Sequence, residues 1–293
     1  MSDDDPRIVD IRSWIDRARR DPLAYTERQA TEVVLAAVSS VPGYGSRIYL
    51  KGGVLMAVVY QSPRSTADLD FTTDLDASSD LPATLRAALD KVLPATAARL
   101  GYPDLVMRVQ SVKERPRRFG TPDTSFPALD VNISYAKRGT REEDHLARGQ
   151  APRVVHMEIS FNEPIHAVEL LRLGTGGASL GAYALTDLIA EKLRALLQQV
   201  IRNRYRRQDV YDIAHLADRF PLDDQERAEI LTSFLDKCAA RGIKPAVDSM
   251  SDPGVIERAR SEWDTMRQEV GALPDFDECF AKVDTLYRSL PWH

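Results

Sequence analysis

Two aspartates placed two residues apart constrain most strongly what this 293-residue chain can fold into. Asp68 and Asp70 lie in the segment RSTADLDF (64–71). The neighbouring Leu69 and Phe71 give this segment the character of a strand, on which residues two apart share one face. Two adjacent carboxylates repel each other and need a cation, and the hard Mg²⁺ ion prefers such oxygen ligands. The segment therefore predicts a metal-binding acid pair on one face of a strand.

A glycine pair before this strand adds a phosphate-binding feature. Gly52 and Gly53 open an apolar segment (54–60) that is expected to be helical. A glycine turn at a helix N-terminus lets phosphate oxygens approach backbone N–H groups. The glycine pair and the acid pair together indicate nucleotide chemistry. The alternative for the acid pair is a charged loop, because three more aspartates follow closely: Asp74, Asp76 and Asp80.

The spacing of apolar residues divides the chain into an α/β part and a helical part. We expect helices at 7–20, from Thr26 to about Ser39, at 54–60 and at 81–100, and strands at 47–51, 64–71, 105–112, 128–135 and 154–161. A loop with the charged cluster KERPRR is expected over 113–127, and the glycine-rich segment 174–181 is expected to be a turn and linker. From Leu185 onward the pattern is helical. We therefore expect an α/β domain over 1–181 and a helical domain over 182–293.

Composition narrows the class of protein. No apolar run approaches the roughly 20 residues of a membrane span, and the acidic N-terminus lacks the layout of a signal peptide. Cys238 and Cys279 are isolated, so a reducing cytoplasm is the simplest compartment. The net charge of −5 argues against a surface coated in basic residues. It does not exclude nucleic acid as a partner, because binding follows the local patch.

Two charged residues interrupt the apolar faces of consecutive predicted helices. Lys192 lies in the apolar arc of the helix that starts near Thr186, on the same row as Leu188 and Leu196. In the next helix, Asp209 lies within the apolar arc and Asp212 at its edge. A lysine can extend past the core to water, and an early acid can cap its helix. Opposite charges facing inward on consecutive helices otherwise indicate a shared polar site or a structural ion pair.

A glycine pair, a spacer and D-x-D on a strand resemble the nucleotidyltransferases of the polymerase-β type. The longer motifs LKGGVL (50–55) and RSTADLDF (64–71) resemble more specifically the AbiEii/MenT toxins of type IV toxin–antitoxin systems. Two later motifs match as well, DLIAEKLRAL (187–196) and RRQDVYD (206–212). The last one departs from the family pattern at Gln208, where a basic residue is usual. The resemblance implies a mixed sheet with flanking helices, followed by an all-helical C-terminal part.

The resemblance also implies roles for individual residues. Asp68 and Asp70 would hold Mg²⁺, and Lys192 and Asp209 would complete the active-site cleft. A third carboxylate on a neighbouring strand usually helps to hold the metal in this superfamily. Glu158 is favoured for this role, with Asp130 as the alternative. Gly52, Gly53 and Lys192 would bind the triphosphate of the NTP. Thr66 would position the phosphates or the metal-binding turn. Arg64 would be a phosphate or structural partner.

The expected function is Mg²⁺-dependent transfer of NMP from an NTP to the 3′ end of tRNA, which blocks translation and growth. Two basic stretches are candidates for contacts with RNA, RPRR (115–118) and RNRYRR (202–207), although both could equally be solvated surface. A winged-helix repressor encoded nearby is the expected antitoxin. Alternatives are nucleotidylation of a protein or a small molecule such as an antibiotic, and nucleotide binding without turnover.

Overall fold

The computed structural model describes residues 5–116, 119, 126–174 and 177–292, which group into two units. The sheet unit comprises Met1–Val59, Thr66–Glu163 and Glu169–Ala182. The helical unit comprises Tyr60–Ser65, Pro164–Val168 and Tyr183–His293. The chain therefore crosses between the units more than once.

The sheet unit contains the strands of the fold. They are β1 (Arg7–Val9), β2 (Ile48–Lys51), β3 (Leu69–Thr73), β4 (Leu105–Arg115), β5 (Ala128–Lys137), β6 (Val154–Ser160), β7 (Val168–Leu173) and β8 (Ser179–Tyr183). In the described part of the chain they form one eight-stranded sheet in the order β1-β7-β8-β2-β3-β6-β5-β4. The pairs β3–β6, β2–β8 and β1–β7 are parallel, and the pairs β2–β3, β5–β6 and β4–β5 are antiparallel. The expected mixed α/β fold is confirmed.

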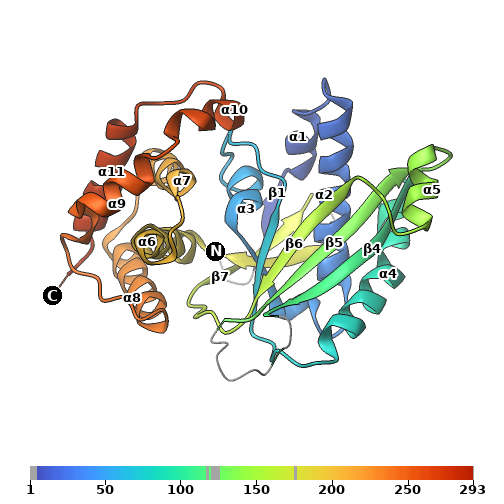
Figure 1. The fold of residues 1–293 in the computed structure, drawn as a ribbon, viewed down its shortest axis with the longest axis horizontal. Coiled ribbons are helices and arrows are strands. Elements are labelled where there is room, and N and C mark those ends of the chain that lie inside the picture. The colour runs from blue at the N-terminus through green and yellow to red at the C-terminus, as the bar shows by residue number, and fades with distance from the viewer. Residues whose placement is uncertain (1–4, 117–118, 120–125, 175–176, 293) are drawn as a thin grey trace. The chain divides into compact units, whose positions relative to one another are not determined.

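Helices of the sheet unit cover one face of the sheet, where α2 and α4 pack against each other and against strands β6 and β4 (Figure 1). The helices are α1 (Ile11–Asp16), α2 (Pro22–Ser40), α3 (Gly52–Val58), α4 (Leu81–Arg99) and α5 (Arg141–Ala147). The core side of the sheet carries Leu69, Met157 and Val131, which are neighbours across three strands and at most 2% exposed. Burying this apolar row fixes the register, because a slip by one residue would turn it to the other face.

Three expectations about the ends of the sheet unit are wrong. Residues 7–9 form strand β1 beside β7, so the expected helix over 7–20 starts only at Ile11. Strand β7 had no periodic signal of its own, and part of the glycine-rich segment 174–181 belongs to strand β8. Helix α2 starts at Pro22 and not at Thr26. Asp21 caps it by accepting hydrogen bonds from the N–H groups of Leu23 and Ala24.

Strand β4 continues through Arg115, so the first residues of the expected loop over 113–127 are strand. Lys113, Glu114 and Arg115 pair with Asp130, Leu129 and Ala128 of β5. This extension matters because it places basic side chains beside the acidic face of the sheet.

The helical unit is built around α6 (Leu185–Arg202), which packs on α7, α8 and α9. The other helices of the unit are α7 (Arg207–Arg219), α8 (Asp224–Ala240), α9 (Pro253–Arg260), α10 (Arg267–Val270) and α11 (Phe276–Arg288). In the described part of the chain, none of the helices is long and apolar enough to cross a membrane.

Gly52 joins strand β2 to helix α3 in a conformation that favours glycine. Its φ is +72°, and a Cβ at this position would lie 2.2 Å from Oδ2 of Asp70. Glycine therefore meets two requirements here, a left-handed backbone and room for the Asp70 carboxylate. The glycine pair and the acid pair, which are separate motifs in the sequence, come together at this point.

Replacing Gly52 with alanine is expected to destabilise the protein more than a left-handed backbone alone would. Gly139 is the matched control, because its φ is +75° and a Cβ there would meet nothing within 4 Å. We expect Gly139→Ala to cost about 1 kcal/mol and Gly52→Ala to cost about 1–3 kcal/mol more because of overpacking. Urea unfolding followed by circular dichroism measures both; equal losses would contradict the close approach of Asp70.

Candidate active site

A row of charged residues crosses five strands of the sheet unit. Lys51 of β2 pairs with Asp70 of β3, which pairs with Glu158 of β6. Glu158 pairs with Asp130 of β5, which pairs with Lys113 of β4. Paired residues share a face and lie about 5 Å apart at Cβ. The row therefore places three carboxylates side by side between two lysines. We call these five residues the charge row.

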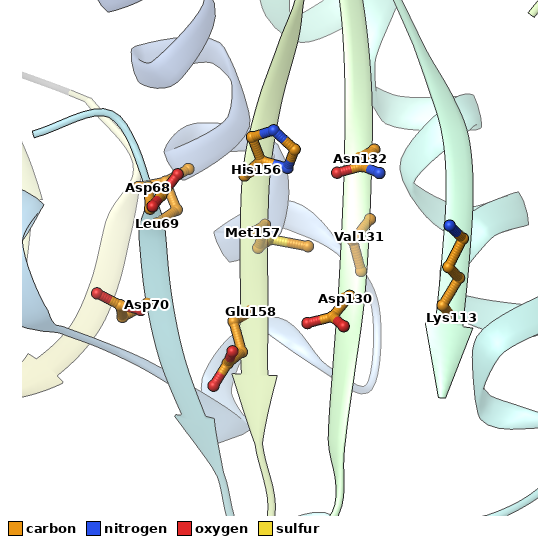
Figure 2. A pocket seen from close by; sticks show the side chains of 10 residues that line it. All are labelled: Asp68, Leu69, Asp70, Lys113, Asp130, Val131, Asn132, His156, Met157 and Glu158. Carbon is orange, nitrogen blue, oxygen red and sulfur yellow. The ribbon is translucent and has the colours of Figure 1, made fainter. Parts of the chain in front are cut away.

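Four residues of the charge row, Asp70, Glu158, Asp130 and Lys113, border an open cavity of about 480 Å³ on the face of the sheet opposite the apolar row (Figure 2). Asp68, two residues before Asp70 in the chain, lines the same cavity together with His156 of β6 and Asn132 of β5. Asp68 is exposed and Asp70 is half-buried. Strand β3 begins at Leu69, so Asp68 lies just before the strand on which it was expected. The cavity gathers four of the predicted acids: Asp68, Asp70, Glu158 and Asp130.

Arg115, the last residue of β4, lies over two of these acids. Its Nη2 is 3.1 Å from Oδ1 of Asp130 and makes a closer contact with Oε2 of Glu158. Although burial lowers the pKa of Arg115, its hydrogen bond to Glu158 and the charges of Glu158 and Asp130 raise it overall. The guanidinium is therefore a fixed positive charge between the two candidates for the third metal-binding carboxylate.

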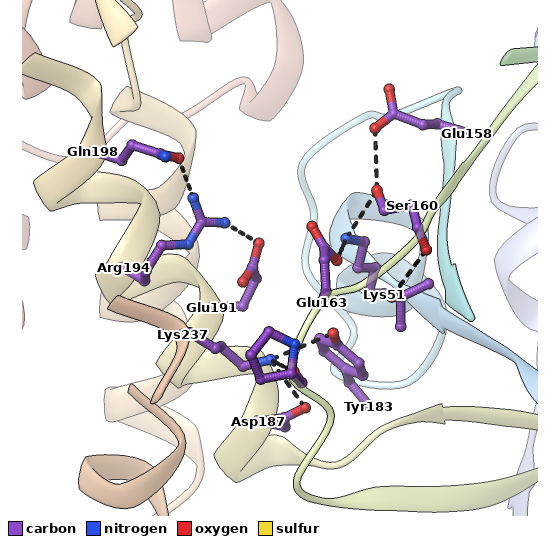
Figure 3. A network of polar contacts seen from close by, with 12 residues as sticks. Lys51, Glu158, Ser160, Glu163, Tyr183, Asp187, Glu191, Arg194, Gln198 and Lys237 are labelled. Carbon is purple, nitrogen blue, oxygen red and sulfur yellow. Dashed lines mark hydrogen bonds and ion pairs between the residues drawn. The ribbon is translucent and has the colours of Figure 1, made fainter. Parts of the chain in front are cut away.

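Lys51 belongs to a second set of contacts at the other end of the charge row (Figure 3). Its ammonium group contacts the carboxylate of Glu163 and lies 3.5 Å from Oγ of Ser160. The same hydroxyl donates to Oε1 of Glu158 at 3.4 Å. The lysine directly before the glycine pair is thus connected to Glu158 through one serine.

The donors of the cavity fit a hard divalent cation, because Asp68, Asp70 and Glu158 offer carboxylate oxygens from adjacent strands. Among the residues that the structure describes, no three acidic, histidine or cysteine side chains are gathered closely enough to hold an ion. Glu158 is directed to Arg115 and Ser160. The chemistry of the donor set therefore suits Mg²⁺, and the rotamer of Glu158 would have to change to complete it.

Gly53 and Thr66 are the remaining residues that are expected at the nucleotide, and RPRR (115–118) is one of the stretches that are expected to contact RNA. Gly53 is buried in the first turn of α3, directly after Gly52. Thr66 is half-buried in the segment that leads to Asp68. Of the stretch RPRR, Arg117 and Arg118 lie outside the described residues.

A second group of predicted residues meets inside the helical unit. Nζ of Lys192 lies 3.0 Å from Asp209 and 2.7 Å from Asp212. Arg64 donates to both oxygens of Asp212, at 3.1 and 3.0 Å, in a bidentate pair. All four are buried, and Asp212 is 0% exposed. The opposite charges on the two helices thus meet in one buried network of four residues.

Gln208 shows why this chain can depart from the family pattern at that position. Its side-chain amide donates to both oxygens of Glu269, at 3.1 and 3.0 Å. Glu269 also pairs with Arg64 at 3.4 Å, and its backbone carbonyl accepts from the N–H of Ser65. A neutral amide is therefore sufficient here, because Arg64 already supplies a charge to Glu269.

Burial and charge act in opposite directions on this network. Burial would raise the pKa of Asp212, but Lys192 and Arg64 outweigh it and hold that pKa below its ordinary value. Burial likewise would lower the pKa of Lys192, and Asp212 and Asp209 raise it overall. Both groups are therefore charged at neutral pH, and each depends on its partner.

Replacing Asp212 with asparagine is expected to destabilise the helical unit by about 3–5 kcal/mol, because it leaves buried cations without their partner. Asp218→Asn on the same helix is the control. Asp218 forms an exposed pair with Lys282, so its loss should cost about 1 kcal/mol or less. Hydrogen–deuterium exchange of α6 and α7 reports the difference; similar exchange in both variants would contradict a supporting role for the network.

The pH dependence of stability gives a second test of Asp212→Asn. The pKa of Asp212 is lowered in the folded protein, so its contribution is complete above the ordinary pKa of aspartate, near 3.9, and is lost as pH falls through the lowered value. The stability gap between the unmodified protein and Asp212→Asn should therefore narrow as the pH falls from 6 to 3. A constant gap would rule out this linkage.

Sequence reasoning missed several residues around both groups. Arg115 was assigned to a loop, although strand pairing brings it to the acids. Lys113 belongs to the charged cluster KERPRR, which was assigned to the same loop, and it lines the cavity together with His156 and Asn132. Alternation with apolar neighbours on the predicted strands places Asn132 on the same face as Asp130 and His156 on the same face as Glu158. The pairing that makes them neighbours is not encoded in a local pattern.

Comparison with solved structures shows which proteins share the fold. MenT4, a nucleotidyltransferase toxin from Mycobacterium tuberculosis, matches with a TM-score of 0.54 and 20% identity, covering 94% of this chain and 88% of MenT4. JHP933 from Helicobacter pylori matches with a TM-score of 0.52 and 13% identity, covering 92% of both chains. At these identities the likeness concerns the fold alone.

A family comparison is more specific. The family described as nucleotidyl transferase AbiEii toxin of type IV toxin–antitoxin systems matches residues 33–282, and the chain belongs to this family. The resemblance found in the motifs is thereby confirmed, and with it the class of enzyme, a nucleotidyltransferase toxin. The family implies an antitoxin as partner. Comparison with functionally curated proteins finds no match.

Proposed function

We propose that this protein transfers NMP from an NTP to the 3′ end of tRNA, with Mg²⁺ held by Asp68, Asp70 and Glu158. The observation that carries the proposal is the charge row. It presents acids from adjacent strands on one open face, directly beside the glycine turn at Gly52. Mg²⁺ bound there would neutralise charge on the α-phosphate and on the leaving pyrophosphate.

The chain's own groups would position the two substrates. The backbone at Gly52 and Gly53 would approach the triphosphate, and Thr66 would position its phosphates or the turn that leads to Asp68. The acceptor hydroxyl forms a bond to the α-phosphorus while the bond to pyrophosphate breaks, and a carboxylate of the row takes the hydroxyl proton. Catalysis is then mainly alignment and charge neutralisation.

The roles of Lys192, Asp209 and Arg64 in nucleotide binding and catalysis stay predictions from the resemblance. Each is engaged in the buried network of the helical unit. A loss of activity in Lys192→Ala therefore supports a role in the reaction only if hydrogen exchange of α6 and α7 is unchanged.

The stretch RNRYRR supports RNA as the acceptor. Arg202 and Arg204 are exposed, and the ring of Tyr205 between the basic residues is 50% exposed. Exposed arginines can follow a phosphate backbone, and an exposed aromatic ring can stack on an unpaired base. We also propose that the antitoxin is a winged-helix repressor encoded nearby, which would act without direct contact with the toxin.

Asparagine at position 68 or 70 is expected to lower NMP transfer by roughly a thousandfold or more, because each removes a carboxylate needed for metal catalysis. Asp76→Asn is the control, since Asp76 is exposed in the same acidic segment. Transfer of label from α-³²P NTPs to purified tRNA measures the effect. Full transfer by Asp68→Asn and Asp70→Asn would exclude these residues from the site.

The acceptor is expected to be the 3′-terminal hydroxyl of tRNA. Intact tRNA should be labelled, whereas tRNA whose terminal ribose has been oxidised with periodate should not, because the attacking hydroxyl is gone. Aminoglycosides and a tRNA-free protein lysate, tested with each NTP, cover the other acceptor classes. Labelling of either one, with none on tRNA, would keep the enzyme class and reject the acceptor.

A further inference from the structure

Both oxygens of the Glu158 carboxylate are engaged by donors. Oε2 contacts Nη2 of Arg115, and Oε1 accepts from the hydroxyl of Ser160 at 3.4 Å. Arg115 reaches Asp130 with the same nitrogen, at 3.1 Å. A cation at this carboxylate would compete with both donors, and it would meet the positive charge of Arg115 at contact distance.

Proximity to the acids alone does not explain why Arg115 binds Glu158. Lys113 also lies on β4 and lines the same cavity, directly opposite Asp130 in the strand pairing. Among the described residues, however, no hydrogen bond or ion pair joins Lys113 to Glu158. Arg115 thus holds the carboxylate of Glu158, whereas Lys113 contributes its charge without holding that carboxylate.

We propose that Arg115 is an internal counter-cation that holds Glu158 in the metal-free protein and must release it before Glu158 can bind the metal. Arg115 is then a positioning residue that lowers the affinity of the cavity for divalent cations. The inference rests on the proposed function, in which Asp68, Asp70 and Glu158 are the metal ligands.

A guanidinium suits this role. It stays protonated at all relevant pH values, so it always competes with the metal for the carboxylate. Its side chain is 50% exposed, so water can solvate it after release at little cost. Once released, it lies beside the cavity as a cation next to the negatively charged substrate. Two states of one side chain would thereby link metal binding to nucleotide binding.

Calorimetric titration with Mn²⁺ in the absence of nucleotide tests the proposal without using activity. We expect Arg115→Ala and the neutral polar Arg115→Gln to bind Mn²⁺ at least about fivefold more tightly than the unmodified protein. Lys113→Ala removes the same charge from the same strand and should change the affinity less than about twofold. Equal gains in the Arg115 and Lys113 variants, or weaker binding without Arg115, would overturn the proposal.

Glu158→Gln provides the second arm, because it removes the charge for which Arg115 competes. The gain from Arg115→Ala should disappear in a Glu158→Gln background, whereas a persistent gain would show that Arg115 does not act through Glu158. Asp68→Asn and Asp70→Asn serve as the reference for the site itself. If they leave Mn²⁺ binding intact, the proposed function fails, whatever the result at Arg115.

Discussion

Repulsion between carboxylates on neighbouring strands is the constraint to which the rest of the sheet unit responds. Asp70, Glu158 and Asp130 are fixed side by side by the register of β3, β6 and β5. The register cannot slip to relieve them, because the same strands bury an apolar row on the opposite face. Their charges must be balanced by cations, and the neighbouring strands supply Lys51 at one end and Lys113 at the other.

The acids of the charge row have cations beside them and still face an open cavity. Arg115 covers Glu158 and Asp130 from the edge strand, and Ser160 connects Glu158 to Lys51. The side chains of Arg115 and Glu158 are 50% and 41% exposed, so an exchange of partners between these two costs little solvation, whereas Lys51 and Ser160 are buried. An acid cluster whose charges are balanced by cations of the same chain is stable without a ligand.

The helical unit meets opposite charges in a different way. Lys192, Asp209, Asp212 and Arg64 are enclosed among the helices, and each charge has a partner in the group. Exchange of partners is expensive in such surroundings, because an uncompensated buried charge costs several kcal/mol. The bidentate pair of Arg64 also ties the segment between α3 and β3 to α7. The same residue types therefore lie on an open face in the sheet unit and are buried with their partners in the helical unit.

Local patterns in the sequence were sufficient for the features that repeat with a simple period. Alternation predicted β5 and β6 and the polar face on which Asp130 and Glu158 lie, and the apolar arcs predicted α6 and α7. They were insufficient for β1 at the edge of the sheet and for β8, which lies between β7 and β2. The three residues of β1 carry too short a pattern, and β8 contains a glycine sequence that locally favours a turn. Both strands exist because neighbouring strands pair with them.

The sequence by itself therefore determined the family, the acid pair, the glycine turn and the chemical class of the site, because these depend on residue types at fixed spacing. Only the tertiary structure decided which groups the acids meet. Lys51, Asp70, Glu158, Asp130 and Lys113 come from five strands, and their alignment depends on strand order and register. The contact of Arg115 with Glu158 depends in addition on how far β4 extends. Such pairings link residues far apart in the chain, where no local period can record them.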